Sequence, residues 1–459
     1  MDRIATVAVV LALTTAATHG RPGPGADAPT LPVGPWPTAM VLDRRTGHAF
    51  VLNSGNNTVS VLDTRRGTLL RTTAVGTFPG AFVQTGYTRA IAVDERSERV
   101  FVGGYGRSGG GITTLDAVSG RALSSTALPD GPAQIMVDEV TNRVFISNAG
   151  VPTRMLVSVL DATSGKLVQT ITLDQGARLV AVDERRGLVL AAGDGRVSVL
   201  DAQSGALVRT IPGGTGSIAV NGRSGRLFVA SAPAGSAGST GAIDVVDLTD
   251  GAILQMIDGL FPQNMTIDEG LNRVYATVSP PTGPGHVAVI DATSGHLIRT
   301  VTVGRYPGQV VASARTGHAF VVNGQDGTVS MLDGRSGHVF RTIGVCPAQT
   351  HGLFDVEGTL SHLIALDERS GRVLVGNPSP YQVPRRPGPG PPPTPILTGP
   401  GSVSMLDAAT GTLLSTVVVG HAPLVMAVDD VAGHAIILNA HDVGPRPGNG
   451  SVSIVAITP

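Results

Sequence analysis

The residue types best suited to chemistry gather in one stretch, residues 345–362. It contains Cys346, His351, Asp355, Glu357 and His362. Imidazole nitrogens and carboxylate oxygens of this kind are ligands for zinc and other divalent metals. Their spacing fits no established metal motif, so the sequence leaves open whether this loop binds metal. We therefore predict no metal and no cofactor, and we keep His351 and His362 as candidate ligand-binding residues.

A second set, of aspartates, could serve acid–base catalysis. Its members are Asp94, Asp138, Asp183, Asp268 and Asp367. Each occupies the same place in a repeated tight turn, where an Asp side chain hydrogen-bonds the backbone of its own turn. The chain also contains no H-E-x-x-H and no P-loop. The sequence therefore predicts no catalytic residue, and it favours a protein that is not an enzyme.

Four aromatic residues share a third pattern, in which each precedes a proline. They are Trp36, Phe78, Phe261 and Tyr306. A set of exposed aromatic side chains suits the binding of a peptide, a sugar or a lipid portion. Alternatively, each ring fills the seam between two structural units while the proline fixes the turn. We take these four residues as candidate ligand-binding residues, with both interpretations open.

A repeat positions all of these residues. One strand pattern, typified by VSVLD, recurs nine times at a usual spacing of about 40–45 residues, the length of one propeller blade. Its copies are residues 59–63, 112–116, 157–161, 197–201, 243–247, 287–291, 329–333, 403–407 and 452–456. Around each copy the chain reads as four strands: an apolar strand ending in Asp, a second strand such as HAFVVN, the VSVLD strand, and a fourth such as LIRT.

The sequence therefore predicts an all-β fold, a single β-propeller of four-stranded blades. We expect about nine repeat units, with seven or eight blades as alternatives. The last unit has three strands of its own, and residues 30–33 resemble a fourth strand that has lost its unit. We expect this N-terminal strand to close the propeller, because an open sheet edge would leave backbone groups unpaired.

The stretches FVLNSGNNTVSVLDTRRGTLLRTTAVGTFPG at 50–80 and FVVNGQDGTVSMLDGRSGHVFRTIGVCP at 320–347 resemble the YVTN family of β-propeller repeats. The resemblance covers nearly the whole chain after its first 29 residues. The resemblance implies a scaffold that occurs in exported and cell-surface proteins, which do not share one enzymatic reaction. The count of nine exceeds the seven or so usual in that family, and the Pro-rich insertion is extra.

Composition agrees with such a fold. Apolar residues make up 42% of the chain, beside 61 Gly and 32 Pro, which is too apolar for disorder and too rich in turn formers for helices. The net charge is −1. Nucleic-acid and anionic-membrane binding depend on positive charge, so we expect neither.

The N-terminus predicts export. Arg3 precedes an apolar run that is too short for a stable membrane span and is followed by small residues. We assign residues 1–19 to a signal peptide, 20–29 to a linker and 30–459 to the propeller, with a Pro-rich loop insertion at 378–401. The protein should be secreted, periplasmic or on the cell surface, and monomeric.

Loop lengths indicate which end of the blades binds. The connections between the first and second strands, and between the third and fourth, hardly vary. The connections between the second and third strands, and those between one unit and the next, carry all the insertions. In repeat proteins, insertions confined to one face often mark the binding face. We predict an exported, non-catalytic scaffold that binds a protein, peptide or glycan there. A metal-dependent, lactonase-like hydrolase and a structural envelope or surface-layer component remain alternatives.

Overall fold

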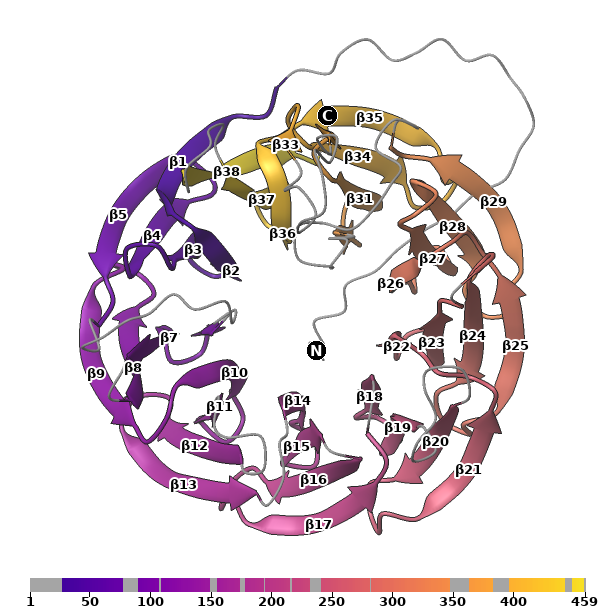
Figure 1. Ribbon diagram of the computed structural model, residues 1–459, viewed down its shortest axis with the longest axis horizontal. Coiled ribbons are helices and arrows are strands. Elements are labelled where there is room, and N and C mark those ends of the chain that lie inside the picture. The colour runs from indigo at the N-terminus through magenta and orange to yellow at the C-terminus, as the bar shows by residue number, and fades with distance from the viewer. Residues whose placement is uncertain are drawn as a thin grey trace, which may run out of the picture. The chain divides into compact units, whose positions relative to one another are not determined.

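The computed structural model describes residues 27–76, 90–106, 109–148, 155–173, 178–193, 195–214, 217–231, 241–280, 282–346, 363–382, 396–441 and 448–457. Nine antiparallel sheets of four strands each account for nearly all regular structure in these residues, together with one two-stranded sheet. The fold is a nine-bladed β-propeller, so the predicted fold class and blade count are confirmed (Figure 1).

The blades belong to two compact units, one of residues 33–261 and one that combines residues up to 32 with those from 262 onward. The first unit contains blade 1, β2 (Pro37–Asp43), β3 (His48–Asn53), β4 (Thr58–Asp63) and β5 (Thr68–Ala74); blade 2, β6 (Ile91–Asp94), β7 (Arg99–Gly106), β8 (Gly109–Asp116) and β9 (Ala122–Leu128); blade 3, β10 (Pro132–Asp138), β11 (Arg143–Asn148), β12 (Met155–Asp161) and β13 (Leu167–Leu173); blade 4, β14 (Arg178–Asp183), β15 (Leu188–Gly193), β16 (Arg196–Asp201) and β17 (Leu207–Pro212); and blade 5, β18 (Ile218–Asn221), β19 (Arg226–Ser231), β20 (Ala242–Asp247) and β21 (Ile253–Asp258).

The second unit contains blade 6, β22 (Asn264–Asp268), β23 (Arg273–Val278), β24 (His286–Asp291) and β25 (Leu297–Thr302); blade 7, β26 (Pro307–Ser313), β27 (His318–Asn323), β28 (Thr328–Asp333) and β29 (Val339–Gly344); blade 8, β30 (Ile364–Asp367), β31 (Arg372–Asn377), β34 (Ser402–Asp407) and β35 (Leu413–Val418); and blade 9, β36 (His421–Asp429), β37 (His434–His441), β38 (Asn449–Ala456) and β1 (Thr30–Pro35). Within blade 8, β32 (Tyr381–Gln382) pairs with β33 (Ile396–Leu397).

Burial explains why the second and third strands of a blade are continuous apolar runs. In β27 and β28 every residue after the first is buried, apart from the half-buried Asp333, because other blades cover both faces of the sheet. Val, Ile and Phe suit such strands. The fourth strand lies at the outer rim, and the side chains of β25 are mostly exposed.

Neighbouring blades within each unit share their cores. The first strands of successive blades contact one another, and Figure 1 shows them on the inner side of each unit. One apolar cluster joins Phe320 of blade 7 to Tyr275 of blade 6 and Val373 of blade 8. No blade buries its apolar faces alone, so each depends on its neighbours for stability.

Blade 9 confirms the predicted use of the N-terminal strand. β1 lies beside β38 as the fourth strand of this sheet. The N–H of Ile454 donates to the carbonyl of Pro29 at 2.9 Å, and the hydroxyls of Thr30 and Ser453 are 3.0 Å apart. Ala28, in the segment predicted to be linker, is buried in the core of this part of the molecule, and its N–H donates to the Val418 carbonyl.

Candidate ligand-binding face

The two ends of a blade differ in what their polar groups do. At one end lie the short turns after the first and third strands, which we call the turn end. There the Asp94 carboxylate accepts the N–H groups of Arg96 and Ser97 at 2.9 and 3.0 Å. Asp138 and Asp367 accept N–H groups of their own turns in the same way. The prediction that these aspartates form turns is confirmed.

The turn end also links one blade to the next. The Glu139 carboxylate accepts the Glu95 N–H, and the Arg96 guanidinium donates to the Glu139 carbonyl at 2.7 Å. In the second unit, Arg369 of blade 8 donates in the same manner to the Asp430 carbonyl of blade 9. The charged side chains repeated at this end therefore serve contacts between blades.

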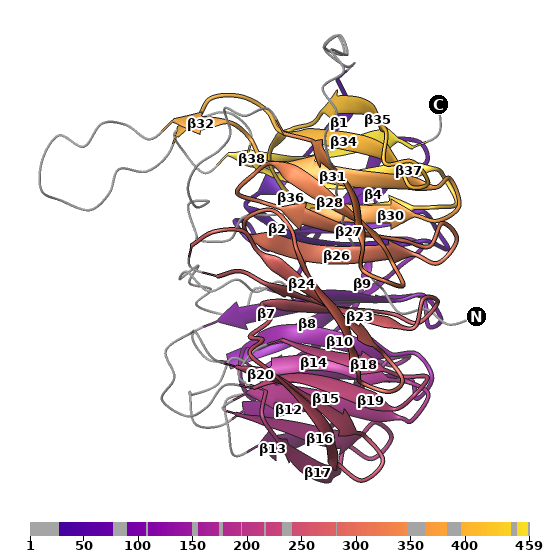
Figure 2. The ribbon, with the colours of Figure 1, turned by 90° about the vertical axis from the view of Figure 1, so that its right-hand side faces the viewer.

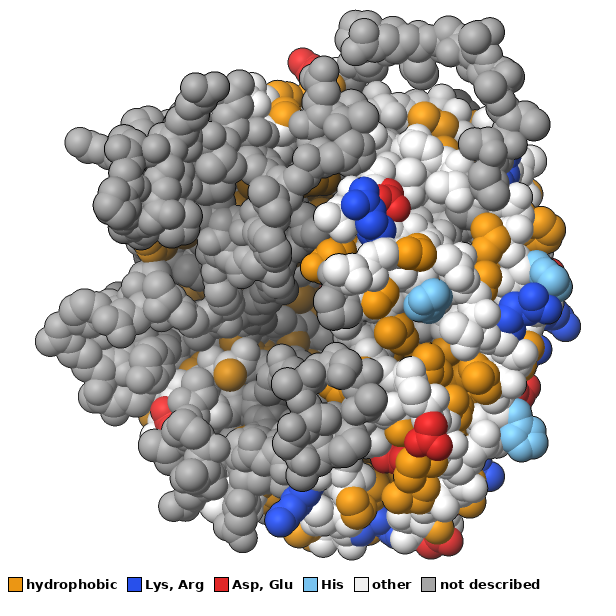
Figure 3. Space-filling model, turned by 45° about the vertical axis from the view of Figure 1, so that its right-hand side comes forward, with side chains coloured by type: hydrophobic (Ala, Val, Ile, Leu, Met, Phe, Trp, Pro, Cys, Tyr) orange, Lys and Arg blue, Asp and Glu red, His pale blue; other side chains and the backbone are white. Residues whose placement is uncertain are grey.

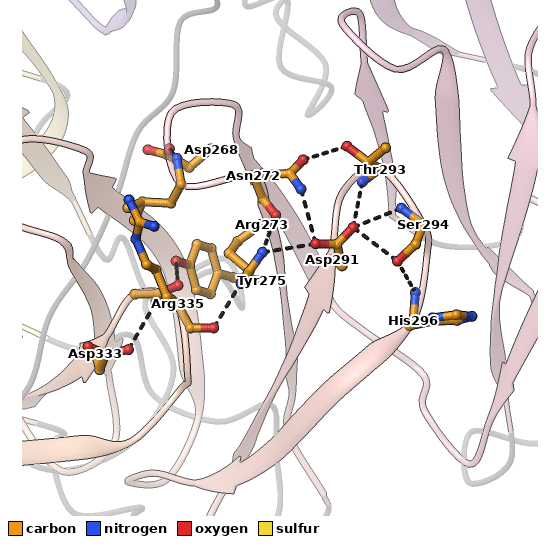
Figure 4. Close-up of polar contacts among 12 residues, drawn as sticks. Asp268, Asn272, Arg273, Tyr275, Asp291, Thr293, Ser294, His296, Asp333 and Arg335 are labelled. Carbon is orange, nitrogen blue, oxygen red and sulfur yellow. Dashed lines mark hydrogen bonds and ion pairs between the residues drawn. The ribbon is translucent and has the colours of Figure 1, made fainter.

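Blade 6 shows these contacts in detail (Figure 4). The Arg273 guanidinium donates to the Asp291 carboxylate at 3.0 Å and, through Nε, to the Arg335 carbonyl of blade 7. The hydroxyl of the fully buried Tyr275 donates to the carbonyl of Gly334, also in blade 7. Burial raises the pKa of Tyr275 well above its ordinary value, so this hydroxyl remains a donor.

Burial alone would raise the pKa of Asp291, but hydrogen bonds from the Ser294 N–H and hydroxyl and the charge of Arg273 outweigh it. The pKa is therefore lowered. The aspartates that end the third strands of seven other blades have lowered pKa values as well: Asp63, Asp116, Asp161, Asp201, Asp247, Asp333 and Asp407.

These eight carboxylates predict acid sensitivity. Groups whose pKa is lowered by folding add stability above the unfolded value, about 3.9 for Asp, and lose it as the pH falls through the folded value. The melting temperature should change little from pH 7 to 5 and fall steeply below about pH 4. Each partly exposed pair should contribute under about 1 kcal/mol. Scanning calorimetry across this range measures the effect.

In Asp291→Asn the melting temperature should fall less steeply below about pH 4, because the substitution removes one titrating group. Asp250→Asn is the matched control, since Asp250 is an exposed turn residue of blade 5. A melting temperature that stays level down to pH 2 would contradict the prediction.

At the other end of the blades, which we call the loop end, two predicted residues have an unusual backbone. Trp36 and Tyr306 immediately precede β2 and β26, and their φ angles are 50° and 51°. Left-handed backbone is rare for bulky residues and costs roughly 1–2 kcal/mol. Ala422 has the same conformation in blade 9, with φ 50°. Trp36 and Tyr306 nevertheless remain 36% and 38% exposed.

Backbone contacts fix this conformation. The Trp36 carbonyl accepts the N–H of Ser54, and the Tyr306 carbonyl accepts the N–H of Gly324, both at 2.9 Å. Beside Tyr306, the Arg305 guanidinium pairs with Asp326 at 2.7 Å. The main chain of each aromatic residue is thus fixed at the loop end, while its side chain remains partly exposed.

A buried asparagine supports each of the two turns. Asn323, fully buried at the end of β27, donates through Nδ2 to the hydroxyls of Thr328 and Ser330 at 3.1 and 3.0 Å. A Cβ atom at Gly304 would lie 2.6 Å from the Cβ of Asn323, so only glycine fits there. Gly34 and Asn53 repeat this arrangement beneath Trp36. The sequence analysis missed these asparagines, although each ends a recognisable strand, HAFVLN or HAFVVN.

The remaining predicted residues differ from these two. Phe261 is half-buried, and a Cβ atom at Gly241 would lie 2.6 Å from its ring, so it packs against the start of β20. The left-handed residue of its turn is Gly259. Phe78, His351 and His362 lie outside the described residues. Within the part of the chain that is described, no three His, Cys, Asp or Glu side chains are grouped to hold a metal ion.

On the face drawn in Figure 3, acidic and basic side chains occur in small scattered groups. Figure 2 shows β32 projecting at the edge of the second unit, where the Pro-rich insertion of blade 8 begins. Among the residues described, none forms a helix with the length and apolar character needed to cross a membrane.

Comparison with known proteins identifies the fold. No family model matches the chain, and no curated protein does. The dihydro-heme d1 dehydrogenase NirN is similar in structure, with a TM-score of 0.53 at 15% identity over 88% of this chain and 80% of that one. A eukaryotic initiation factor gives 0.54 at 11% identity over 88% and 92%. BamB from Moraxella catarrhalis gives 0.49 at 15% over 79% and 92%. At these identities the first two likenesses support the propeller fold and carry no statement about ligand.

Proposed function

We propose that this protein is an exported, non-catalytic binding scaffold of the YVTN-repeat type that recognises its ligand at the loop end of its blades. The observation that carries this proposal is the left-handed backbone at Trp36 and Tyr306. Strained backbone persists where surrounding structure enforces it, and it is often found at ligand-binding sites. Exposed aromatic rings held in such a turn suit a peptide or a glycan.

The turn end is less suited to ligand binding, which supports the choice of the loop end. Its repeated Asp, Glu and Arg side chains are engaged in turns and in contacts between blades. Few of them are free to select a ligand, whereas the side chains of Trp36 and Tyr306 are partly exposed. The loop end therefore offers aromatic surface to a ligand.

Trp36 is the only tryptophan of the chain, so its fluorescence reports on the loop end of blade 1. We expect hits from a glycan array and a peptide library to shift or quench its emission. Trp36→Ala should weaken binding at blade 1, and Tyr306→Ala should weaken binding at blade 7, each about tenfold or more, since a buried aromatic contact contributes roughly 1.5–3 kcal/mol.

Phe340→Ala is the matched control, because Phe340 is an exposed aromatic residue on the outer strand β29. It should bind as the wild type does. Loss of binding in Phe340→Ala, with Trp36→Ala and Tyr306→Ala unaffected, would place the site elsewhere. One equivalent of bound divalent metal in purified protein would instead favour the hydrolase.

Export is the second part of the proposal, and it rests on the charged start and apolar run of residues 1–19. We expect protein isolated from its native host to begin between residues 17 and 27. Intact-mass measurement tests this, with the full-length chain made in a cell-free system as the reference mass. A mature protein that still begins at Met1 would contradict it.

A further inference from the structure

The asparagines of the chain fall into two groups by exposure. All twelve lie in the described residues, and three of them are exposed: Asn56, Asn264 and Asn449. The other nine are buried or half-buried, and some of these, such as Asn53 and Asn323, hold the turns described above. Exposure thus separates three asparagines from the rest.

The same three asparagines share a sequence pattern. Each is followed two residues later by Thr or Ser, in Asn56-Asn57-Thr58, Asn264-Met265-Thr266 and Asn449-Gly450-Ser451. This is the acceptor pattern for N-linked glycosylation, in which the middle residue is not Pro. In Asn377-Pro378-Ser379 the middle residue is Pro, and Asn377 is only 3% exposed. Every exposed asparagine therefore lies in an acceptor pattern, and no buried or half-buried one does.

All three acceptors lie at the loop end of their blades. Asn56 is in the connection between β3 and β4, while Asn264 and Asn449 are the first residues of β22 and β38. An attached oligosaccharide is bulky and polar, so it requires an asparagine whose side chain reaches solvent. Blades 1, 6 and 9 can therefore carry an oligosaccharide at these positions without disturbing their cores.

Blade 1 shows the geometry of one acceptor in detail. The Thr58 hydroxyl donates to Oδ1 of Asn56 at 2.7 Å and accepts the Nδ2–H of Asn53 at 3.0 Å. Asn57, between Asn56 and Thr58, has a left-handed backbone with φ 53°. The Thr58 contact engages the amide oxygen of Asn56 rather than the amide nitrogen, which is the atom that bonds to a sugar. The two groups that define the acceptor thus meet in the folded protein.

We propose that Asn56, Asn264 and Asn449 are N-linked glycosylation sites. The donor is an oligosaccharide joined through pyrophosphate to a lipid, and a transferase of the export route catalyses the transfer. A bond forms between Nδ2 of the asparagine and the anomeric carbon of the sugar, while the bond from that carbon to the pyrophosphate oxygen breaks. The lipid pyrophosphate leaves, and the amide nitrogen gives up one proton. The proposal rests on the export part of the proposed function, because the chain meets this donor only during export.

A glycan on Asn56 would border one of the two aromatic turns. The N–H of Gly55 donates to the Pro35 carbonyl at 3.0 Å, directly before Trp36. In blade 7 the residue that corresponds to Asn56 is Asp326, whose carboxylate pairs with Arg305. Blade 7 therefore has no acceptor at this place. Glycosylation would distinguish the two turns, although their backbones are alike.

The test is peptide mapping by mass spectrometry of protein isolated from its native host. Treatment with a peptide-N-glycosidase in heavy-oxygen water converts each glycosylated asparagine to a labelled aspartate. We expect an oligosaccharide, and then this label, at Asn56, Asn264 and Asn449, whereas Asn377 should be unmodified. Asn56→Gln, made in the same host, should lose the glycan of blade 1 and keep the other two.

Thr58→Ala should lose the same glycan although Asn56 is retained, because the acceptor hydroxyl is gone. Thr58→Ser is the matched control and should keep the glycan, since its hydroxyl remains. Asn56→Gln leaves the contact between Thr58 and Asn53 in place, so it decides the question if Thr58→Ala does not fold.

Unmodified asparagines in a protein that has lost its N-terminal signal would overturn these sites and leave export standing. An unmodified protein that still begins at Met1 would overturn both. A glycan that persists on blade 1 in Asn56→Gln and in Thr58→Ala would also refute the assignment.

Discussion

Deleting the N-terminal strand should abolish or severely reduce the stability of the protein. A chain that begins at Pro35 lacks nearly all of β1, the fourth strand of blade 9. It loses several backbone hydrogen bonds, each contributing about 0.5–1.5 kcal/mol. It also loses the burial of Ala28 and Val33, which are 8% and 5% exposed, at roughly 1.5–3 kcal/mol for a Val side chain. The sum is comparable to the stability of a typical domain, about 5–15 kcal/mol.

The control is a chain that begins at Asp27, which keeps every described residue of this segment. It should melt like the mature protein, whereas the shorter chain should aggregate or melt at a much lower temperature, because β38 becomes an open edge. A synthetic peptide of residues 27–36 should restore stability in trans, and a scrambled peptide should not. Equal melting of both truncated chains would refute the role of β1.

The second large effect is expected from a single methyl group at Gly304. In Gly304→Ala the new Cβ would lie 2.6 Å from the Cβ of Asn323, closer than real Cβ contacts come. Asn323 is fully buried, so it cannot move aside without losing its bonds to Thr328 and Ser330. Overpacking costs about 1–3 kcal/mol, and a buried polar group left unpaired costs about as much again.

Gly344→Ala is the matched control in the same blade, because nothing lies within 4 Å of its added Cβ. Thermal unfolding should show a large decrease for Gly304→Ala and little change for Gly344→Ala. Since Tyr306 follows Gly304 by two residues, ligand binding should weaken too. If both variants melt like the wild type, the packing beneath this turn is not as close as described.

The fold was predictable because each repeat unit carries its own pattern. The VSVLD and HAFVVN strands are buried on both faces and therefore read as apolar runs, and β1 could be inferred from the missing strand of the last unit. Within the segment predicted as linker, Ala28 is buried against residues of blades 8 and 9, which its small side chain does not indicate in the sequence.

The candidate site was predictable only in part. The aromatic–Pro pattern drew attention to Trp36 and Tyr306, but it could not show their left-handed backbone, which opposes residue preference, or the close packing of Gly34 on Asn53 and of Gly304 on Asn323 beside them. The same pattern at Phe261 gives a different turn, because Gly259 takes the positive φ.

The pairing of β1 with β38 has a consequence for the order of folding. Of the described strands, β1 comes first along the chain and its partner β38 comes last, about 400 residues later. Closing a flexible loop of that length costs roughly 5 kcal/mol, similar to what the pairing contributes. The pairing becomes favourable only after the intervening blades have folded and shortened the free loop. β1 must therefore remain unpaired until β38 has been made, and of the nine described blades blade 9 is completed last.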